Sequence, residues 1–189
     1  GWTRGLRLLR RIGANARYWT DSSNKIPLDV SEGEALAGMC VDFYARNFMQ
    51  RLEETTGRSR MGFTLPAGGT TPSVDPIALF RGAPNPALAT RFIEFVLSME
   101  GQRLWAWRAG TPGGPRHTAL RRLPVRQDYY TPENLAHASD PGLLPYAAGT
   151  ALTYDPALTG SSFSAIRLVI RAMCLDPHEE LKTAWAALI

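Results

Sequence analysis

The sequence predicts a protein of the α/β class. Short apolar stretches that suit buried strands alternate with longer stretches of helical periodicity through the first half of the chain. Glycine and proline separate these stretches, as expected of turns between elements. The chain of 189 residues, 44% of them apolar and 20% charged, is long enough for one or two compact units with a buried core.

Helices are expected where apolar residues recur every three or four positions and a capping residue precedes them. Ser31 with Glu34 fits a capping box, in which each side chain satisfies a free backbone donor at a helix start. Gly13 suits the left-handed position after a helix end. The predicted helices cover residues 2–12, 31–37, 44–56, 86–97, 98–107, 163–174 and 176–189, and a further short helix begins at residue 131.

Strands are expected where short apolar runs lie between glycine, proline or polar residues. These runs are residues 16–19, 39–41, 61–65 and 77–80. The strand at 39–41 would deliver Asp42, Phe43 and Tyr44 at its carboxyl end, where open α/β sheets bind ligands. The alternative is that Asp42 caps the following helix and Tyr44 packs on it, and spacing alone favours this alternative.

Two further features bear on function. Residues 66–72 contain Gly68 and Gly69 and suit either a hinge or an ordinary surface loop. The net charge of +4 comes mostly from arginine, including Arg4, Arg7 and Arg11 on one side of the first helix. A solvated basic face is the usual reading of such a pattern, so we expect no nucleic-acid partner.

Catalytic signatures are missing from the chain. It has no nucleophile elbow, no phosphate-binding loop of the Walker type and no dinucleotide fingerprint. The three histidines and the two cysteines, Cys40 and Cys174, show no metal-type spacing. No stretch approaches the roughly 20 apolar residues that span a bilayer. The sequence therefore predicts neither an enzyme nor a membrane-spanning protein.

Three segments carry a resemblance to a known family. They are Gly33-Glu34 leading to Asp42-Phe43-Tyr44, the turn Gly82-Ala83-Pro84-Asn85, and the helix 89–102, which ends Ser98-Met99-Glu100-Gly101-Gln102. The chain resembles the extracellular solute-binding proteins of bacterial ABC importers, and in particular their ferric-iron-binding branch. The resemblance covers residues 1 to about 126 well and the remainder weakly.

The resemblance implies a two-lobed, periplasmic-binding-protein-like fold of the transferrin-like class. Residues 1–64 would belong to the second lobe, 65–120 to the crossover and the first lobe, and 121–189 to a return segment. Complete members are nearly twice as long, so the chain would be a carboxyl-terminal portion with the amino-terminal lobe largely missing. We therefore expect unpaired sheet edges and an oligomeric or aggregation-prone chain.

The resemblance also implies a ligand site. Iron-binding members hold the metal through two adjacent tyrosines, and only the second has a counterpart here, Tyr44, because Phe43 replaces the first. Tyr44 is therefore the tyrosine ligand that the resemblance leaves for a metal, and Fe3+ would be a transported solute rather than a cofactor. Either Asp42 would supply a carboxylate in place of the missing tyrosine, or the pocket would take a different solute, and Thr70 would line the cleft. Ser22 and Ser23 would either contact the ligand or simply form a turn.

The function implied is that of a periplasmic or extracellular receptor, membrane-associated through its transporter. It would capture a ferric iron complex or a small anion between two lobes and deliver it to the membrane permease of an ABC import system. The alternatives are a sensor or regulatory ligand-binding module of the same fold, and an enzyme built on that fold. An enzyme would need an acid–base pair near Tyr44, for which Asp42 is the only nearby candidate.

Overall fold

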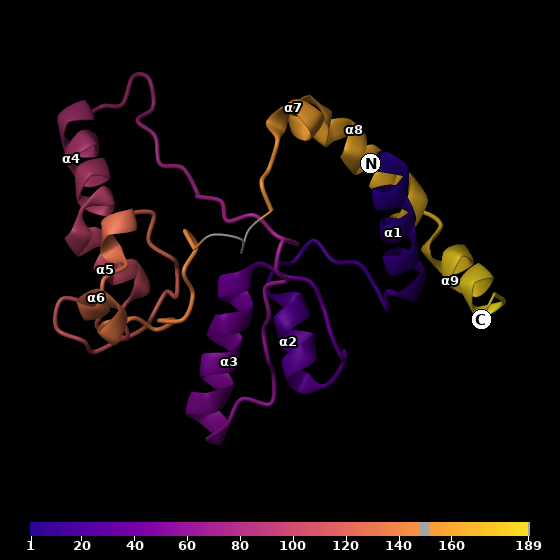
Figure 1. Ribbon diagram of the computed structural model, residues 1–189, viewed down its shortest axis with the longest axis horizontal. Helices are drawn as coiled ribbons and strands as arrows, with labels where there is room; N and C mark the ends of the chain where they lie inside the picture. Colours follow the sequence, from indigo (N-terminus) through magenta and orange to yellow (C-terminus); the bar gives the residue numbers. More distant parts are fainter. Residues whose placement is uncertain (148–151, 189) are drawn as a thin grey trace. The chain divides into compact units, whose positions relative to one another are not determined.

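The computed structural model describes residues 1–147 and 152–188, and helices dominate them (Figure 1). The described residues contain no strand, and one isolated antiparallel bridge joins Trp107 to Ala138. The α-helices are α1 (Trp2–Asn15), α2 (Lys25–Glu32), α3 (Asp42–Thr56), α4 (Pro86–Leu97), α5 (Met99–Ala106), α6 (Pro132–His137), α7 (Pro156–Thr159), α8 (Phe163–Ile170) and α9 (His178–Ala186). Shorter helical turns are η1 (Gln127–Tyr129), η2 (Gly160–Ser162) and η3 (Arg171–Leu175), the last a π-type turn.

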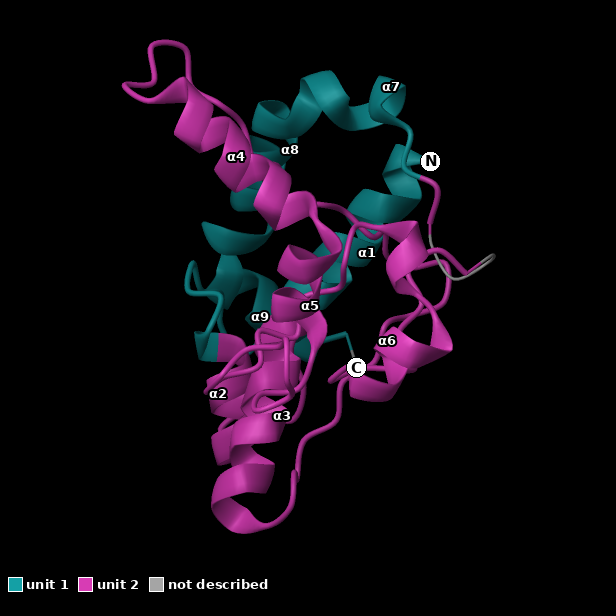
Figure 2. Ribbon diagram, turned by 90° about the vertical axis from the view of Figure 1, so that its left-hand side faces the viewer, with its two compact units in different colours: residues 1–25, 154–189 teal, residues 26–153 magenta. Residues whose placement is uncertain are grey.

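The chain forms two compact units (Figure 2). Unit 1 combines residues 1–25 with residues 154–189, and unit 2 consists of residues 26–153. Unit 1 thus joins the two ends of the chain, whereas unit 2 is one continuous stretch. The assignment of residues 1–64, 65–120 and 121–189 to lobes remains a prediction.

The core of unit 1 lies where α1 contacts η3 and α9. Gly13 and Ala14 are buried in the last turn of α1, against the fully buried Cys174. A Cβ atom on Gly13 would stand 3.2 Å from the Cβ of Cys174, so the absence of a side chain permits this close approach. The helix predicted over 2–12 is confirmed, but the prediction for Gly13 was wrong: this glycine lies inside the helix.

The predicted helix starts in unit 2 are confirmed at three polar caps. The Asn85 side chain accepts a hydrogen bond from the Leu88 amide at 3.1 Å, and Ser98 accepts one from the Gly101 amide at 3.1 Å. Thr131 accepts one from the Asn134 amide at 3.4 Å. Each oxygen satisfies one of the donors that a helix start leaves free. Proline follows Asn85 and Thr131 at the first helical position, where its missing N–H costs nothing.

The segment 98–102, which carried much of the resemblance, has a packing role. Gly101, in the first turn of α5, lies so close to the end of α4 that a Cβ atom there would be 2.1 Å from the Phe95 carbonyl oxygen. The buried Gln102 donates to the Val96 carbonyl at 2.8 Å and accepts from the Val125 amide at 2.7 Å. The glycine and the glutamine thus fix the corner between α4 and α5 and attach residue 125 to it.

The core of unit 2 surrounds the indole of Trp107. Ala106, Trp107 and Tyr129 are buried, and Met99, Tyr130 and Leu135 pack against them. Asn134 is buried beside this cluster, where its amide donates to the Tyr129 carbonyl at 2.9 Å and its oxygen accepts from Arg103 at 3.0 Å. The apolar cluster and this polar side chain together hold α5, η1 and α6 in place.

Two local predictions were wrong. Ser31 does not start a helix but lies in the last turn of α2, where its hydroxyl donates to the Leu28 carbonyl at 2.7 Å. Gly33, with a φ of +83°, ends that helix in the left-handed conformation that glycine adopts most readily. The four segments predicted as strands do not form strands. A strand requires hydrogen bonds to a partner backbone, and no backbone among the described residues pairs with these segments. The α/β class is therefore not borne out by the part of the chain that the structure describes.

Candidate functional site

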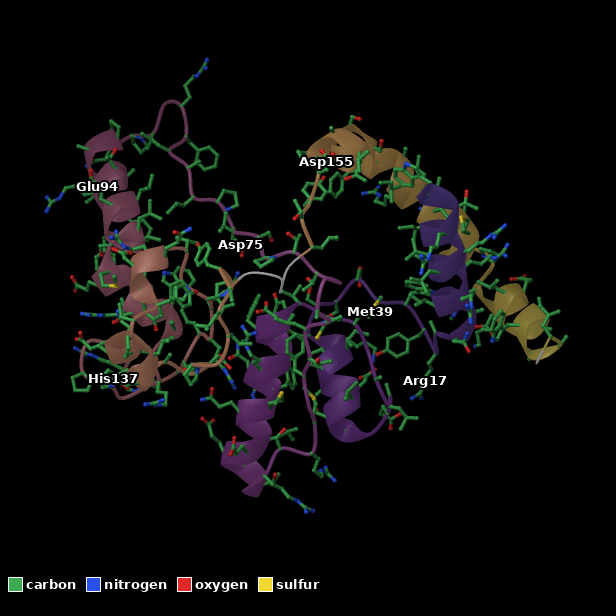
Figure 3. All side chains as sticks on the ribbon, in the orientation of Figure 1. Arg17, Met39, Asp75, Glu94, His137 and Asp155 are labelled. Atoms are coloured by element: carbon green, nitrogen blue, oxygen red, sulfur yellow. The ribbon has the colours of Figure 1, made fainter. Side chains whose placement is uncertain are left out.

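The first turn of α3 carries the predicted site residues. Val41 is the N-cap, and Asp42, Phe43 and Tyr44 are the first three helical residues. Gly57, with a φ of +76°, ends the helix as the sequence indicated. Before this helix, the chain is exposed instead of forming a buried strand: Met39, marked in Figure 3, has 71% of its surface accessible. The site is thus built on a helix start.

Asp42 forms an ion pair along its own helix. Its carboxylate lies 2.6 Å from Nη2 of Arg46, one turn later in α3. Arg46 is almost fully buried, with 3% of its surface accessible, whereas Asp42 is partly exposed. The carboxylate of Asp42 therefore balances a buried cation, and it also lies at the positive end of the helix dipole.

Arg46 connects α3 to residues 121 and 140. Its Nη2 donates to the Arg121 carbonyl at 2.8 Å, and its Nε lies 3.4 Å from Oδ2 of Asp140. Arg121 in turn donates two hydrogen bonds to the carboxylate of Asp140, from Nε at 3.0 Å and from Nη2 at 2.5 Å. Arg121 has a φ of +56°, an uncommon conformation for a residue with a side chain, and these bonds hold it there. The result is a largely buried network of two arginines and two aspartates.

An aromatic pair capped by a guanidinium lies beside this network. The rings of Phe43 and Tyr44 are 4.2 Å apart between centroids. The guanidinium carbon of Arg122 is 3.8 Å from the centre of the Phe43 ring, within the range of a cation–π contact. Arg122 also forms an ion pair with the exposed Asp75, which is marked in Figure 3 on the segment between α3 and α4.

A shallow hollow adjoins the two arginines. It measures about 240 Å³, including space open to solvent, and its lining includes Arg121, Arg122, Tyr130 and Asp140. The Tyr130 hydroxyl donates to the Pro124 carbonyl at 2.8 Å, and burial raises the pKa of this phenol, so it stays protonated at neutral pH. Its enclosed space for the centre of a water-sized molecule is only about 10 Å³, so the hollow is far smaller than an enclosed ligand pocket. It suits one wall of a site better than a complete site.

Thr70 lies where two distant segments meet. Its carbonyl accepts a hydrogen bond from the Leu152 amide at 2.7 Å. Two residues earlier, Gly68 has a φ of +64°, a conformation that suits the proposed hinge. The role of Thr70 in a cleft remains a prediction.

Ser22 and Ser23 belong to unit 1, whereas Asp42, Tyr44 and Thr70 belong to unit 2. The Ser22 amide donates to the Thr20 hydroxyl at 3.0 Å, and its carbonyl accepts from the Lys25 amide at 3.2 Å. Ser22 therefore takes part in a turn, one of the two roles that the sequence left open. A ligand contact for either serine remains a prediction.

The described residues contain no group of three or more histidine, cysteine, aspartate or glutamate side chains that could hold a metal ion. Cys40 and Cys174 are free thiols, the first half-buried and the second buried. Burial raises the pKa of both thiols. Neither thiol belongs to a group of potential metal ligands among the described residues.

Sequence reasoning missed Arg46, Arg121, Arg122 and Asp140. The four-residue spacing of Asp42 and Arg46 could have indicated an ion pair within α3. The contacts to residues 121 and 140 had no such signal, because about 75 to 94 positions separate them from Arg46.

Comparison with known families gives one match. The sequence model described as "Bacterial extracellular solute-binding protein" matches residues 1–133. Comparisons with curated proteins and with solved structures give no match. The match supports solute binding outside the cytoplasm and a periplasmic-binding-like fold in general terms, and it does not distinguish iron from other solutes. Because it covers more than half of the chain, the protein belongs to the family of bacterial extracellular solute-binding proteins.

Proposed function

We propose that this protein captures a small anionic solute at the start of α3 and delivers it to the membrane permease of an ABC importer. It does so without chemistry on the solute. The observation that carries the choice of an anion is the position of Arg122, whose guanidinium stands 3.8 Å from the Phe43 ring. In the iron-binding relatives, the position of Phe43 supplies a phenolate to the metal.

Electrostatics argue against ferric iron at this position. Phe43 offers no oxygen ligand, and the only adjacent phenol is that of Tyr44. The carboxylate of Asp42 is paired with Arg46 at 2.6 Å, so using it for a metal would leave the buried Arg46 and Arg121 with Asp140 as their remaining carboxylate in the network. A trivalent cation would also meet the positive charge of Arg122. Ferric iron, for which Tyr44 would be the remaining ligand, is thus the less favoured solute.

Arg122 is available to an anion. Its partner Asp75 is mostly exposed, and exposed ion pairs contribute only about 0 to 1 kcal/mol. An incoming carboxylate or phosphate group can therefore replace Asp75 at small cost and bind the same fork of donors. The positive end of the α3 helix dipole would add to this attraction.

The remaining site residues have supporting roles in the proposal. Tyr44 donates a hydrogen bond to the solute, and Phe43 forms an apolar wall. Asp42 positions Arg46 rather than the solute. Thr70 provides a polar contact from another segment of unit 2. Solute binding favours a closed arrangement of the lobes because it contacts that arrangement more extensively.

The test is a calorimetric titration of the full chain with inorganic phosphate, succinate and ferric citrate. We expect the wild-type chain to bind one of the two anions, phosphate or succinate. In Arg122→Gln the affinity for that anion should fall at least about tenfold, which corresponds to about 1.4 kcal/mol. The matched control is Arg51→Gln, an exposed arginine near the other end of α3. Unchanged anion affinity in Arg122→Gln would overturn the proposed site.

Iron is tested by its spectrum. Ferric citrate should give no visible phenolate-to-iron charge-transfer band with the wild-type chain. Phe43→Tyr restores the tyrosine pair, yet Arg122 still opposes the metal, so a strong band is expected only in the double variant Phe43→Tyr with Arg122→Gln. A charge-transfer band and tight ferric binding in the wild type would contradict the choice of an anion.

A further inference from the structure

The strongest unexplained feature of the chain is an apolar helical run in unit 1. Residues Pro156–Leu175 form 20 continuous helical residues with a hydropathy of 1.3, long and apolar enough to cross a membrane by those two measures. The sequence prediction that no such segment exists was therefore wrong. Only 6% of the segment is buried. A helix this apolar is ordinarily covered by something.

One side of the run is partly covered by unit 1 itself. The run ends in η3, which contacts α1, and Cys174 is fully buried there, with its thiol 3.6 Å from the Leu9 carbonyl oxygen. Ile166, Ile170 and Met173 are half-buried. By helical spacing these residues share the face that carries Cys174.

The opposite side is an uncovered apolar stripe. Its members lie three to four positions apart and are all exposed: Ala165, Leu168, Val169, Ala172 and Leu175. Leu168 and Val169 have 64% and 39% of their surfaces accessible. We call this set the outer stripe.

Two arginines border the outer stripe. Arg167 and Arg171 are exposed and lie one turn apart, between the outer stripe and the covered face. Arg171 forms an exposed ion pair with Asp176 at 3.1 Å. Two arginines make full insertion into a hydrocarbon core unfavourable, whereas an amphipathic helix at a bilayer surface commonly carries them.

The charge of the whole chain is concentrated in unit 1. This unit holds nine of the 21 basic residues and five of the 17 acidic residues, so it carries the entire net charge of +4. Unit 2 holds twelve of each and is formally neutral. On α1, the exposed basic side chains are Arg4, Arg7, Arg10 and Arg11. Since α1 packs on the covered face, its arginines attract an anionic membrane surface through the net charge of the unit, and Arg167 and Arg171 are the cations beside the outer stripe.

We propose that unit 1 binds the surface of an anionic phospholipid bilayer, with the outer stripe of α8 and η3 at the level of the headgroups. A second copy of the chain is a poorer occupant, because it would bring one unit of charge +4 against another. The family match ends at residue 133, before this helical run, so the proposed role is additional to solute capture.

The test is co-sedimentation of the full chain with vesicles of phosphatidylglycerol mixed with phosphatidylcholine, compared with phosphatidylcholine alone. We expect at least tenfold stronger binding to the anionic vesicles and a marked loss at 0.5 M salt, because salt screens the attraction. Leu168→Ser with Val169→Ser, and separately Arg167→Glu with Arg171→Glu, should each weaken binding at least tenfold.

Matched controls come from unit 2. Leu88→Ser with Phe92→Ser removes exposed apolar side chains from α4, and Arg58→Glu with Arg60→Glu reverses the same number of exposed charges. Both should leave vesicle binding unchanged. Equal losses in these controls, or no vesicle binding by the wild type, would overturn the proposal. So would a dimer in light scattering that Leu168→Ser with Val169→Ser dissociates.

A measurement on the wild type covers the case in which a unit 1 variant does not fold. Hydrogen–deuterium exchange with and without anionic vesicles should show new protection over residues 163–175. Protection confined to unit 2 would contradict the assignment.

Discussion

Arg46 and Arg121 each donate a hydrogen bond to the backbone carbonyl of the other. The distance from Arg46 Nη2 to the Arg121 oxygen is 2.8 Å, and the distance from Arg121 Nη1 to the Arg46 oxygen is 2.6 Å. Two like charges approach this closely because Asp42 and Asp140 lie beside them. The pair holds the α3 helix against a segment 75 residues later in the chain.

Asp140→Ala should lower the free energy of unfolding by about 3 kcal/mol, because it leaves Arg46 and Arg121 buried with one carboxylate fewer. Urea unfolding followed by circular dichroism measures the change. The control is Asp128→Ala, which breaks the exposed pair with Arg126 and should change stability by less than about 1 kcal/mol. Similar losses of unfolding free energy in both variants would show that the buried network stabilises the fold no more than an exposed ion pair does.

Gly101→Ala should destabilise the corner between α4 and α5 by about 2 kcal/mol or more. The new Cβ would meet the Phe95 carbonyl oxygen at 2.1 Å and the Val96 carbonyl oxygen at 2.9 Å, and neither backbone atom can move without moving α4. Gly62→Ala, where the space is open, is the matched control. Thermal unfolding compares the two, and a normal melting temperature for Gly101→Ala would contradict the packing described for this corner.

Gly13→Ala and Gly5→Ala place the same methyl group at two positions of α1. At Gly5 nothing lies within 4 Å, so the better helix propensity of alanine should add about 0.5 to 1 kcal/mol. At Gly13 the methyl meets Cys174 at 3.2 Å and Leu181 at 3.4 Å, so we expect a net loss of stability. If chemical denaturation showed a gain of stability in both variants, the packing of α1 against η3 would have to adjust to the extra methyl group at low cost.

The two thiols should differ in reactivity and in their effect on stability with pH. Under native conditions the half-buried Cys40 should react with a thiol reagent before the buried Cys174. Both reactions should accelerate as pH rises, because burial raises each pKa and the thiolate is the reactive form. Mass spectrometry of partly alkylated protein gives the order, and modification of Cys174 first would contradict it.

The raised pKa of Cys174 also predicts the sign of a pH effect. The unfolded thiol ionises near its ordinary pKa of about 8.5, before the folded thiol does. Its contribution to stability is therefore complete below that pH and declines as pH rises through the folded pKa. Cys174→Ala should remove this decline, and a difference between wild type and variant that is constant with pH would contradict the prediction.

Local signals explain what could be predicted from the sequence. Asn85, Ser98 and Thr131 act as caps through atoms three residues away, so short patterns were sufficient. Ser31 failed as a cap because the same serine is compatible with a helix end, and Gly33 decides between the two. The family resemblance supplied the solute-binding role, which the family match supports in general terms.

Non-local contacts explain what could not be predicted. The strand at 39–41 depended on a partner backbone, which no local pattern reveals. Asp42 was identified as a site residue, but its pairing partner Arg46 belongs to a network completed by Arg121 and Asp140 far along the chain. The left-handed backbone of Arg121 follows from these bonds and has no signature in its own sequence neighbourhood.

The hydrogen bond from the Leu152 amide to the Thr70 carbonyl gives residues 71–151 the topology of an insertion. Thr70 and Leu152 lie side by side, so the stretch between them starts and ends at the same place in unit 2. The number of residues in that stretch is therefore not fixed by a distance that it has to bridge. Its attachment to α3 depends on Arg121, Arg122 and Asp140, so we expect changes of length to be tolerated only where these three residues keep their contacts.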